Sequence, residues 1–521
     1  MTQDFNWKKL QNGSDIRGVA LEGVADEPVN LSPEVALRLG QAFGSWLSTR
    51  LGKTGADLRV SVGRDSRLSG PVLMAEVMRG LASLGITVYD FGMASTPAMF
   101  MSTVTPGFEC DAGLMLTASH LPFNRNGLKF FTPQGGLGKG DITEILTLAA
   151  GEVSGVSGEV TGTIEPRDFM SVYADQLVQY IRTQVAASEG SSETSRDTID
   201  PHPLKGLKIV VDAGNGAGGF FASKVLEPLG ADTTGSQFLD PDGHFPNHVP
   251  NPEDGAAMAA ICQAVLTHQA DFGIIFDTDV DRSAAVDHRG QELNRNRLIA
   301  LISAIVLAEH PGSTIVTDSI TSEGLTTFIE DLGGKHHRFK RGYKNVITES
   351  MRLNETGEES WLAIETSGHG AMRENYFLDD GAYLVSKLLV ELAKCKRSGK
   401  TLTDLIAPLK EPQESQEIRL KIKAEDFQSY GNQVIEDLKT FIETQADWTI
   451  APNNYEGVRV ICSAPQEQGW FLLRLSLHDP VLPLNLESNV SGGVKAIYDR
   501  KGVISTITCK CIITTLTIDR S

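Results

Sequence analysis

A serine, a histidine and a lysine lie close together in the segment TASHLPFNRNGLKFF (117–131), where they could handle a phosphate or activate a nucleophile. Ser119 directly precedes His120, and an Asn-Gly pair, which suits a tight turn, precedes Lys129. Such a turn would point the lysine back at a phosphate. A serine hydroxyl is a weak nucleophile unless a base or a metal activates it. The segment alone therefore leaves Ser119 open as a nucleophile, a phosphate carrier or a surface-turn residue.

An acidic cluster, DTDVDR, follows the apolar run FGIIF. The spacing predicts that the carboxylates of Asp277, Asp279 and Asp281, at i, i+2 and i+4, lie on one side of an extended segment. Three like charges are unfavourable together unless a cation joins them, and Mg²⁺ prefers such oxygen ligands. We therefore predict a Mg²⁺ site, with Arg282 beside it to bind a phosphate. The alternative is a solvated acidic turn. An EF-hand is rejected because its sixth and twelfth positions would be Arg282 and His288.

Two further motifs combine polar residues at short spacing. In AIETSGHGAM, Glu365 and Ser367 are two residues apart and could grip neighbouring hydroxyls. His369 could donate to a phosphate or move a proton, although a hydrogen-bonded loop histidine fits equally well. In RLSLHDP, Arg474 and Ser476 could clamp a phosphate.

Basic residues also occur in two glycine-containing stretches. Arg17 lies in SDIRGV, which we expect to be a loop, and Lys344 follows a glycine in KRGYKN. Stretches of this kind are more often solvated loops than sites.

These motifs follow strand-like segments that alternate with helical patterns such as 71–85. Alternation of this kind predicts βαβ units and largely parallel sheets, in which ligands bind at the carboxyl ends of strands. The apolar run 298–308 is too short to span a bilayer and predicts a buried helix. The strand-like segments, which are β-branched runs followed by Asp, Gly or Ser, are 58–65, 86–92, 207–219, 270–282 and 313–320.

The chain has 521 residues, which predicts roughly three or four domains. Boundaries fall near 168, 311 and 412, giving segments 1–168, 169–311, 312–412 and 413–521. The net charge of −19 argues against nucleic acid or an anionic membrane as a partner. An anionic substrate would then need a locally basic pocket.

The cysteines and the N-terminus bear on the compartment. Six scattered cysteines without a Cys-x-x-Cys pair argue against zinc and for reduced thiols. The N-terminus has no apolar signal region. We expect a cytoplasmic protein, or a plastid one if a transit peptide has been removed.

Taken in order, the motifs TASHLP, DTDVDR, ETSGH and RLSLHDP resemble those of the α-D-phosphohexomutase superfamily, most closely its phosphomannomutase/phosphoglucomutase branch. The segments VGRDSRLSG (62–70) and DGHFPNHVPNPED (242–254) are similar too. The resemblance implies three similar α/β domains with mixed sheets and a smaller C-terminal α+β domain resembling a TATA-binding-protein fold. The four would surround a central cleft.

The resemblance also implies roles for the site residues. Ser119 would carry a phosphoryl group and, with the three aspartates, hold one Mg²⁺ per chain. The residues implied near the reacting oxygens are Arg17, His120, Lys129, Arg282 and His369. Glu365 and Ser367 would bind the sugar hydroxyls. The phosphate that is not transferred would be bound by Lys344, Arg474, Ser476 and His478.

The implied reaction interconverts hexose 1-phosphate and 6-phosphate of glucose, mannose or both, through a hexose 1,6-bisphosphate intermediate and activator. Phosphoglucosamine mutase is the near alternative. A catalytically inactive sugar-phosphate-binding relative and a hexose bisphosphate synthase are others. The implied partners are hexose phosphates, and we expect a monomer or weak dimer. The alternating run 502–518 predicts a strand or hairpin in place of the family's closing helix.

Overall fold

The computed structural model describes residues 5–151, 161–188, 199–476 and 479–500. His478 and the predicted hairpin 502–518 lie outside these residues. The chain divides into two compact units. Unit 1 comprises Met1–Asn294 and Ser367–Asp404, and unit 2 comprises Arg295–Thr366 and Leu405–Ser521.

The first sheet of unit 1 has the strand order β1-β2-β6-β5-β3-β4-β8, with β7 paired to β6. The neighbours β5, β3, β4 and β8 are parallel, whereas β2, β6 and β5 pair antiparallel. The expectation of a largely parallel sheet is therefore wrong here. The loop between β5 and β6 is too short for the crossover that parallel strands need. The strands are β1 (Gln11–Asn12), β2 (Asp15–Val19), β3 (Arg59–Arg64), β4 (Thr87–Met93), β5 (Ala112–Leu116), β6 (Arg125–Thr132), β7 (Gly135–Gly136) and β8 (Ile164–Pro166).

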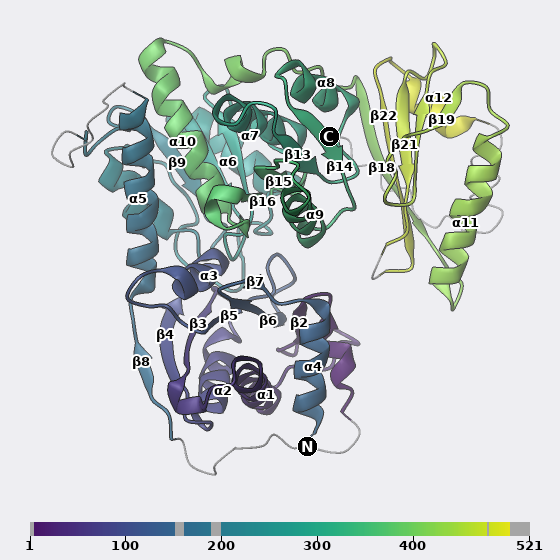
Figure 1. The fold of residues 1–521 in the computed structure, drawn as a ribbon. Coiled ribbons are helices and arrows are strands. Elements are labelled where there is room, and N and C mark those ends of the chain that lie inside the picture. Colours follow the sequence, from purple (N-terminus) through teal and green to yellow (C-terminus); the bar gives the residue numbers. More distant parts are fainter. Residues whose placement is uncertain (1–4, 152–160, 189–198, 477–478, 501–521) are drawn as a thin grey trace. The chain divides into compact units, whose positions relative to one another are not determined.

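Helices cover both faces of this sheet (Figure 1). The face that carries Val60, Val62 and Leu114 forms one apolar core with α1, α2 and α4. The opposite face meets α3 closely: a Cβ on Gly113 would lie 2.3 Å from the Met99 carbonyl oxygen, so only glycine fits there. The helices are η1 (Trp7–Leu10), α1 (Pro33–Leu51), η2 (Gly55–Asp57), α2 (Gly70–Ala82), α3 (Thr96–Val104), α4 (Lys139–Ala150) and α5 (Phe169–Ala187).

A second sheet of unit 1 has the order β12-β11-β10-β9. The fully buried β10 pairs parallel with β9 and antiparallel with β11, so the acidic cluster falls in the hairpin between β10 and β11. The elements are β9 (Ile209–Asp212), η4 (Phe221–Leu226), η5 (Glu227–Leu229), α6 (Gly255–His268), β10 (Phe272–Phe276), β11 (Ser283–Asp287) and β12 (Glu292–Leu293).

The later segment of unit 1 adds an antiparallel strand pair and a long helix. Gly381 begins the helix, and Asp380 caps it by accepting a hydrogen bond from the Tyr383 amide. Asp380 also accepts a 2.7 Å hydrogen bond from the hydroxyl of Tyr173 on α5, which ties this segment to the earlier part of the unit. The elements are β16 (Gly370–Met372), η6 (Arg373–Asn375), β17 (Leu378–Asp379) and α10 (Gly381–Ser398).

Unit 2 begins with α7 (Arg295–Glu309), which contains the predicted buried apolar helix and buries most of that run. The central strand β13 pairs parallel with β14 on one side and β15 on the other. Here helices connect the strands, as parallel pairing requires. The other elements are β13 (Thr314–Thr317), α8 (Glu323–Asp331), β14 (Lys335–Arg338), α9 (Tyr343–Glu355) and β15 (Leu362–Ile364).

The C-terminal part of unit 2 is an antiparallel sheet of order β18-β22-β21-β20-β19 with α11 packed on it (Figure 1). The expectation that a closing helix is missing is wrong: α12 follows β22 and buries Val494 and Ile497. The helix is short, so its apolar pattern is too brief to recognise. The elements are β18 (Glu414–Lys421), α11 (Phe427–Ile442), β19 (Trp448–Ile450), β20 (Val458–Cys462), β21 (Gly469–Leu473), β22 (Val481–Ser488) and α12 (Gly493–Asp499).

Among the described residues, no helix has both the length and the apolarity that crossing a bilayer demands. The predicted boundaries near 168, 311 and 412 stay predictions.

Candidate active site

Ser119 lies in the loop that follows β5, with its backbone in the left-handed region at φ 50°. Its amide donates to the Thr117 hydroxyl at 2.8 Å, and the residue is 6% exposed. A non-glycine residue rarely adopts this conformation unless its surroundings fix it, and such residues concentrate at functional sites. The loop therefore holds the serine hydroxyl in a defined direction.

The acidic cluster is a turn, and the prediction of an extended segment is wrong. Phe276 pairs with Ser283 across β10 and β11, and Val280 at φ 68° reverses the chain between them. The turn still brings the acids together, because carboxylate oxygens of Asp277, Asp279 and Asp281 lie within 4.8 Å of one another.

The serine loop meets the acidic turn directly. The Ser119 hydroxyl donates to Asp277 Oδ2 at 2.9 Å. Arg282 Nη2 donates to the serine Oγ at 2.9 Å, and Nη1 donates to Asn251 Oδ1 at 3.1 Å. Arg282 is 2% exposed, so its charge acts in a dry environment where it is strong.

His120 lies beside the same hydroxyl. Its Nδ1 is 3.4 Å from Ser119 Oγ and accepts a 2.6 Å hydrogen bond from Arg282 Nη2. Burial, the guanidinium of Arg282 and that of Arg17 lower the pKa of His120 to about 3. The imidazole is therefore neutral near pH 7, with Nδ1 as an acceptor.

Lys129 reaches the acids from the sheet. It lies on β6, so the Asn-Gly pair before it is inside a strand and the predicted turn is wrong. A Cβ on Gly127 would lie 2.2 Å from the Ile16 carbonyl oxygen on β2, so this glycine permits close strand approach. Lys129 Nζ donates to Asp279 Oδ2 at 2.8 Å and also to Asp281. Burial alone would lower the pKa of Lys129, but these two carboxylates raise it well above its ordinary value.

The acidic turn has oxygen atoms that fit a cation. Oδ1 of Asp279 and Oδ1 of Asp281 are buried and accept no hydrogen bond. Burial and the two neighbouring acids raise the pKa of Asp277 well above its ordinary value. For Asp281, burial raises the pKa, but Lys129 and nearby cations lower it more. Buried acceptors left unsatisfied are unfavourable, so this donor set suits a divalent cation.

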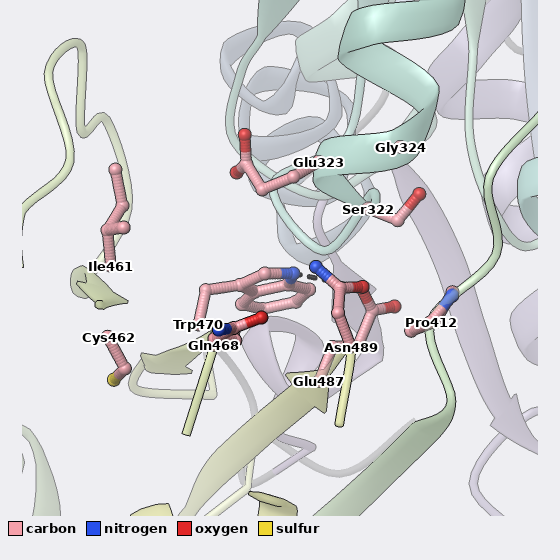
Figure 2. A pocket seen from close by; sticks show the side chains of 11 residues that line it. Ser322, Glu323, Gly324, Pro412, Ile461, Cys462, Gln468, Trp470, Glu487 and Asn489 are labelled. Carbon is pink, nitrogen blue, oxygen red and sulfur yellow. Dashed lines mark hydrogen bonds between the residues drawn. The ribbon is translucent and has the colours of Figure 1, made fainter. Parts of the chain in front are cut away.

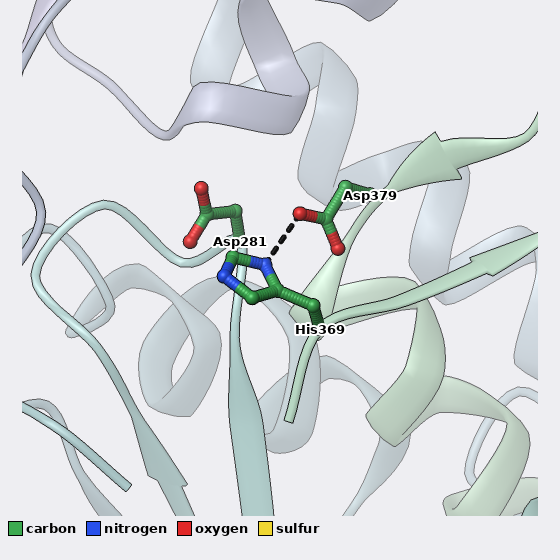
Figure 3. A group of neighbouring side chains, drawn as sticks. All are labelled: Asp281, His369 and Asp379. Atoms are coloured by element: carbon green, nitrogen blue, oxygen red, sulfur yellow. Dashed lines mark hydrogen bonds and ion pairs between the residues drawn. The ribbon is translucent and has the colours of Figure 1, made fainter. Parts of the chain in front are cut away.

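His369 belongs to unit 1 and faces the same turn. Its Nδ1 hydrogen-bonds Asp379 Oδ2 at 2.5 Å, and Asp281 lies close to both (Figure 3). Burial lowers the pKa of His369, but Asp379 and Asp281 raise it to about 9. The imidazolium is therefore the charged form near neutral pH. Ser367, which is buried, precedes this residue, and the neighbouring Gly368 carbonyl accepts from the Ser283 amide at 3.3 Å.

Arg17 lies on β2, opposite Gly127 of β6, and the predicted loop is wrong. Its Nη2 donates to Asp15 Oδ2 at 2.8 Å. The glycine on β6 leaves room for its side chain, because a Cβ there would lie 2.8 Å from the arginine Cδ.

Unit 2 gathers a second set of predicted residues. Glu365 is buried after β15, and its Oε1 accepts from the Gly342 amide at 2.6 Å. The Arg341 amide donates to Glu456 Oε2 at 3.0 Å, and Arg474 Nη1 is 3.7 Å from Glu456 Oε1. Glu456 thus connects the loop before α9 to the end of β21.

Two other predicted residues belong to the same region of unit 2. Lys344 lies in the first turn of α9, whereas the sequence predicts a loop. Ser476 accepts from the Asp479 amide at 3.3 Å. Lys344 lies two residues after Gly342, whose amide donates to Glu365.

Sequence reasoning missed several residues that build the site. Arg67 donates to carbonyl groups of the serine loop, and Thr96 donates to Asp279. Asn251 accepts a hydrogen bond from Arg282. Asp379 holds His369. Arg67 lies in 62–70 and Asn251 in 242–254, two segments that resemble those of the family. That resemblance is the sequence signal for these residues, but it does not show which groups they hydrogen-bond.

A pocket in unit 2 lies between the start of α8 and β20–β22 (Figure 2). Glu323, Trp470 and Glu487 line it, and Trp470 Nε1 donates to Glu487 Oε2 at 2.8 Å. None of the predicted site residues that the structure describes lines it.

Family models match most of the chain. The models are described as phosphoglucomutase/phosphomannomutase alpha/beta/alpha domain I, domain II and domain III, and they match residues 8–153, 189–290 and 294–411. They confirm the prediction of three α/β domains, and the antiparallel C-terminal sheet follows the last of them.

Individual relatives match over nearly the full length. A phosphomannomutase/phosphoglucomutase of Pseudomonas putida is 32% identical and covers 93% of both chains. A phosphoglucomutase of Neisseria gonorrhoeae is 30% identical and covers 94% of this chain and 95% of its own. The crystal structure of a phosphoglucomutase/phosphomannomutase family protein from Burkholderia thailandensis matches with a TM-score of 0.75 and 27% sequence identity. The match covers 98% of this chain and 99% of the other.

Proposed function

The chain belongs to the phosphoglucomutase/phosphomannomutase family, and on that basis we propose that it interconverts hexose 1-phosphate and hexose 6-phosphate through a phosphoserine at Ser119. The observation that carries the proposal is the position of the Ser119 hydroxyl, which contacts both Asp277 and Arg282 at 2.9 Å. A phosphoryl group on this oxygen would lie where negative charge can be offset.

In the proposed reaction a sugar hydroxyl attacks the phosphorus on Ser119. A sugar O–P bond forms, the bond from Oγ to phosphorus breaks, and the proton of the sugar hydroxyl passes to Oγ, which leaves as the serine hydroxyl. Arg282 offsets the charge on the transferring group, which is the main requirement for this chemistry. The neutral His120 lies beside the path of this proton. Its Nδ1 is 3.4 Å from Oγ and accepts from Arg282 Nη2, so it would take up the proton only when Arg282 turns from Nδ1 to the phosphoryl group. The reverse transfer, from the other phosphate of the bisphosphate, restores the phosphoserine.

Asp277, Asp279, Asp281 and an oxygen of the phosphoserine would hold one Mg²⁺. When bound, this ion would polarise the phosphoryl oxygens as a Lewis acid. Lys129 balances the charge of two of the acids, and Arg17 lies on the adjacent strand. His369, kept protonated by Asp379, adds a further positive charge beside Asp281.

Glu365 and Ser367 would bind the sugar hydroxyls in both orientations. Lys344, Arg474, Ser476 and, outside the described residues, His478 would hold the phosphate that is not transferred. We further propose glucose and mannose phosphates as substrates, hexose 1,6-bisphosphate as activator, a monomeric or weakly dimeric state, and a cytoplasmic location.

Coupled assays with glucose, mannose and glucosamine 1-phosphates, each with and without glucose 1,6-bisphosphate, test the proposal. We expect turnover of glucose and mannose phosphates that small amounts of bisphosphate stimulate and that Ser119→Ala abolishes. Turnover of glucosamine phosphate alone would indicate the phosphoglucosamine alternative. Accumulation of bisphosphate from an external high-energy donor would indicate a synthase, and no turnover would indicate an inactive relative.

A further inference from the structure

The carbonyl groups of the serine loop converge on one buried arginine. Arg67 Nη1 donates to the carbonyl oxygens of Pro122 and Arg125 at 2.8 and 2.9 Å. Its Nη2 donates to that of Leu121 at 2.6 Å and to that of Ser119 itself. Four N–H groups of a single guanidinium thus bind four carbonyl oxygens of one loop.

Arg67 is itself fixed from behind. Its side chain is fully buried, and Nε lies 3.4 Å from Asp65 Oδ2. The Asp65 carboxylate also accepts from the Arg67 amide at 3.0 Å. The ring of Phe245 lies over the guanidinium, with 5.4 Å between its centroid and Cζ. A planar group with this many partners has one orientation available to it.

The loop that covers Arg67 also reaches Arg282. A Cβ on Gly243 would lie 2.5 Å from the Leu68 amide nitrogen, so this loop packs directly on the segment that contains Arg67. A few residues after Phe245, Asn251 accepts from Arg282 Nη1. The guanidinium under the serine loop and the guanidinium at the serine hydroxyl are therefore held by the same stretch of chain.

We propose that Arg67 is a positioning residue for phosphoryl transfer, which fixes the Ser119 backbone at φ 50° so that the group on Oγ faces the acidic turn and Arg282. This inference rests on the proposed function. Without the four carbonyl contacts, the loop could relax toward commoner backbone angles and turn Oγ away from Arg282. The phosphoserine would then face water more often. Water would attack phosphorus, the Oγ–P bond would break, Oγ would take a proton, and inorganic phosphate would leave.

The test compares two conservative substitutions in the full-length chain. Arg67→Lys keeps the charge, but an ammonium has three donors at one point and cannot bind four carbonyls in a plane. Arg182→Lys is the matched control, because Arg182 also donates to two backbone carbonyls of unit 1, those of Pro201 and Pro228. Assays use glucose 1-phosphate with saturating glucose 1,6-bisphosphate, and activity is normalised to the fraction of folded protein.

For Arg67→Lys we expect kcat to fall by about ten- to a hundredfold, the effect of a misplaced reacting group, with KM within about twofold. Phosphoserine, followed by intact mass, should be lost to inorganic phosphate faster than in wild type. Arg182→Lys should change none of these. A fold-only role predicts normal kcat for the folded fraction and an unchanged rate of phosphoserine loss, and that result would overturn the proposal.

Two further results keep the test decisive. If Arg67→Lys does not fold, a crystal structure of the wild-type phosphoenzyme decides: the proposal requires the guanidinium to retain the loop carbonyls, and its departure from them would overturn it. A wild-type chain without mutase activity or phosphoserine would refute the proposed function itself. A normal wild type with a normal Arg67→Lys would refute only the role of Arg67.

Discussion

The Ser119 hydroxyl donates a 2.9 Å hydrogen bond to the carboxylate of Asp277, which lies 158 residues later in the chain. The contact joins the loop after β5 to the hairpin between β10 and β11. It places a nucleophilic oxygen against a cluster of buried acids, an arrangement that is unfavourable unless cations compensate it. Arg282 and Lys129 provide part of that compensation, and two unsatisfied carboxylate oxygens remain.

Asp279→Asn should lower kcat by about a hundredfold or more, in the range for losing a major electrostatic stabiliser. The substitution removes charge from a residue with an unsatisfied buried oxygen, so the apparent affinity for Mg²⁺ should fall as well. Steady-state assays across a Mg²⁺ titration check both effects. Asp271→Asn, at the other end of β10, is the control. Equal activity of EDTA-treated wild type and variant at every Mg²⁺ concentration would refute the metal assignment.

Asp379→Asn should move the alkaline limb of the kcat–pH profile toward neutral pH. The carboxylate raises the pKa of His369 to about 9, so the imidazolium persists well above pH 7 in the wild type. Without it, burial lowers the pKa and the imidazolium is lost at lower pH. Profiles from pH 6 to 10 measure the shift. Superimposable alkaline limbs would show that the charge on His369 does not limit turnover.

Arg474→Ala should mainly raise KM for glucose 1-phosphate, because the side chain is assigned to the phosphate that does not react. An increase of roughly ten- to a hundredfold corresponds to loss of a charged hydrogen bond. Arg419→Ala, on the exposed side of β18, removes one positive charge from the same unit and serves as control. A fall in kcat at unchanged KM would instead assign Arg474 to the chemical step.

Much of this arrangement follows from sequence pattern, and the remainder depends on tertiary pairing. Strand-like segments that give way to polar residues mark β3, β10 and β13, and the run FGIIF is continuously hydrophobic because β10 is buried on both faces. The identities of Ser119 and the aspartates also indicate their chemistry, and the predicted resemblance to the phosphohexomutases is confirmed.

Other features could not be predicted from local sequence. Arg67 binds backbone carbonyl groups, and because every residue has one, the sequence does not show which of them it binds. Lys129 contacts Asp279, 150 residues later in the chain, and this contact depends on the tertiary packing of two different sheets. Residue spacing predicts an extended acidic segment, because spacing alone does not reveal that β11 returns antiparallel to β10.

Glu487→Gln should stabilise the protein more at pH 8 than at pH 5. Burial raises the pKa of this carboxyl from 4.5 to about 7, so the folded state favours the protonated acid. For wild type, stability is unaffected by this group below about pH 4.5 and falls as pH rises toward 7, where the unfolded state releases the proton more readily. Thermal unfolding at both pH values checks the prediction.

The matched control for Glu487→Gln is Glu436→Gln, which removes one charge from the exposed face of α11. A gain in stability for Glu487→Gln that is the same at pH 5 and pH 8 would contradict the raised pKa. The Trp470 hydrogen bond can persist in the variant, since the amide oxygen also accepts.

The most direct measurement is the intact mass of the full-length protein after incubation with glucose 1,6-bisphosphate and Mg²⁺, followed by peptide mapping. We predict the mass of one added phosphoryl group, located on Ser119, removed on incubation with excess glucose 6-phosphate and absent from Ser119→Ala. No added mass, or a phosphoryl group on another residue, would contradict the central claim that Ser119 carries the group that is transferred.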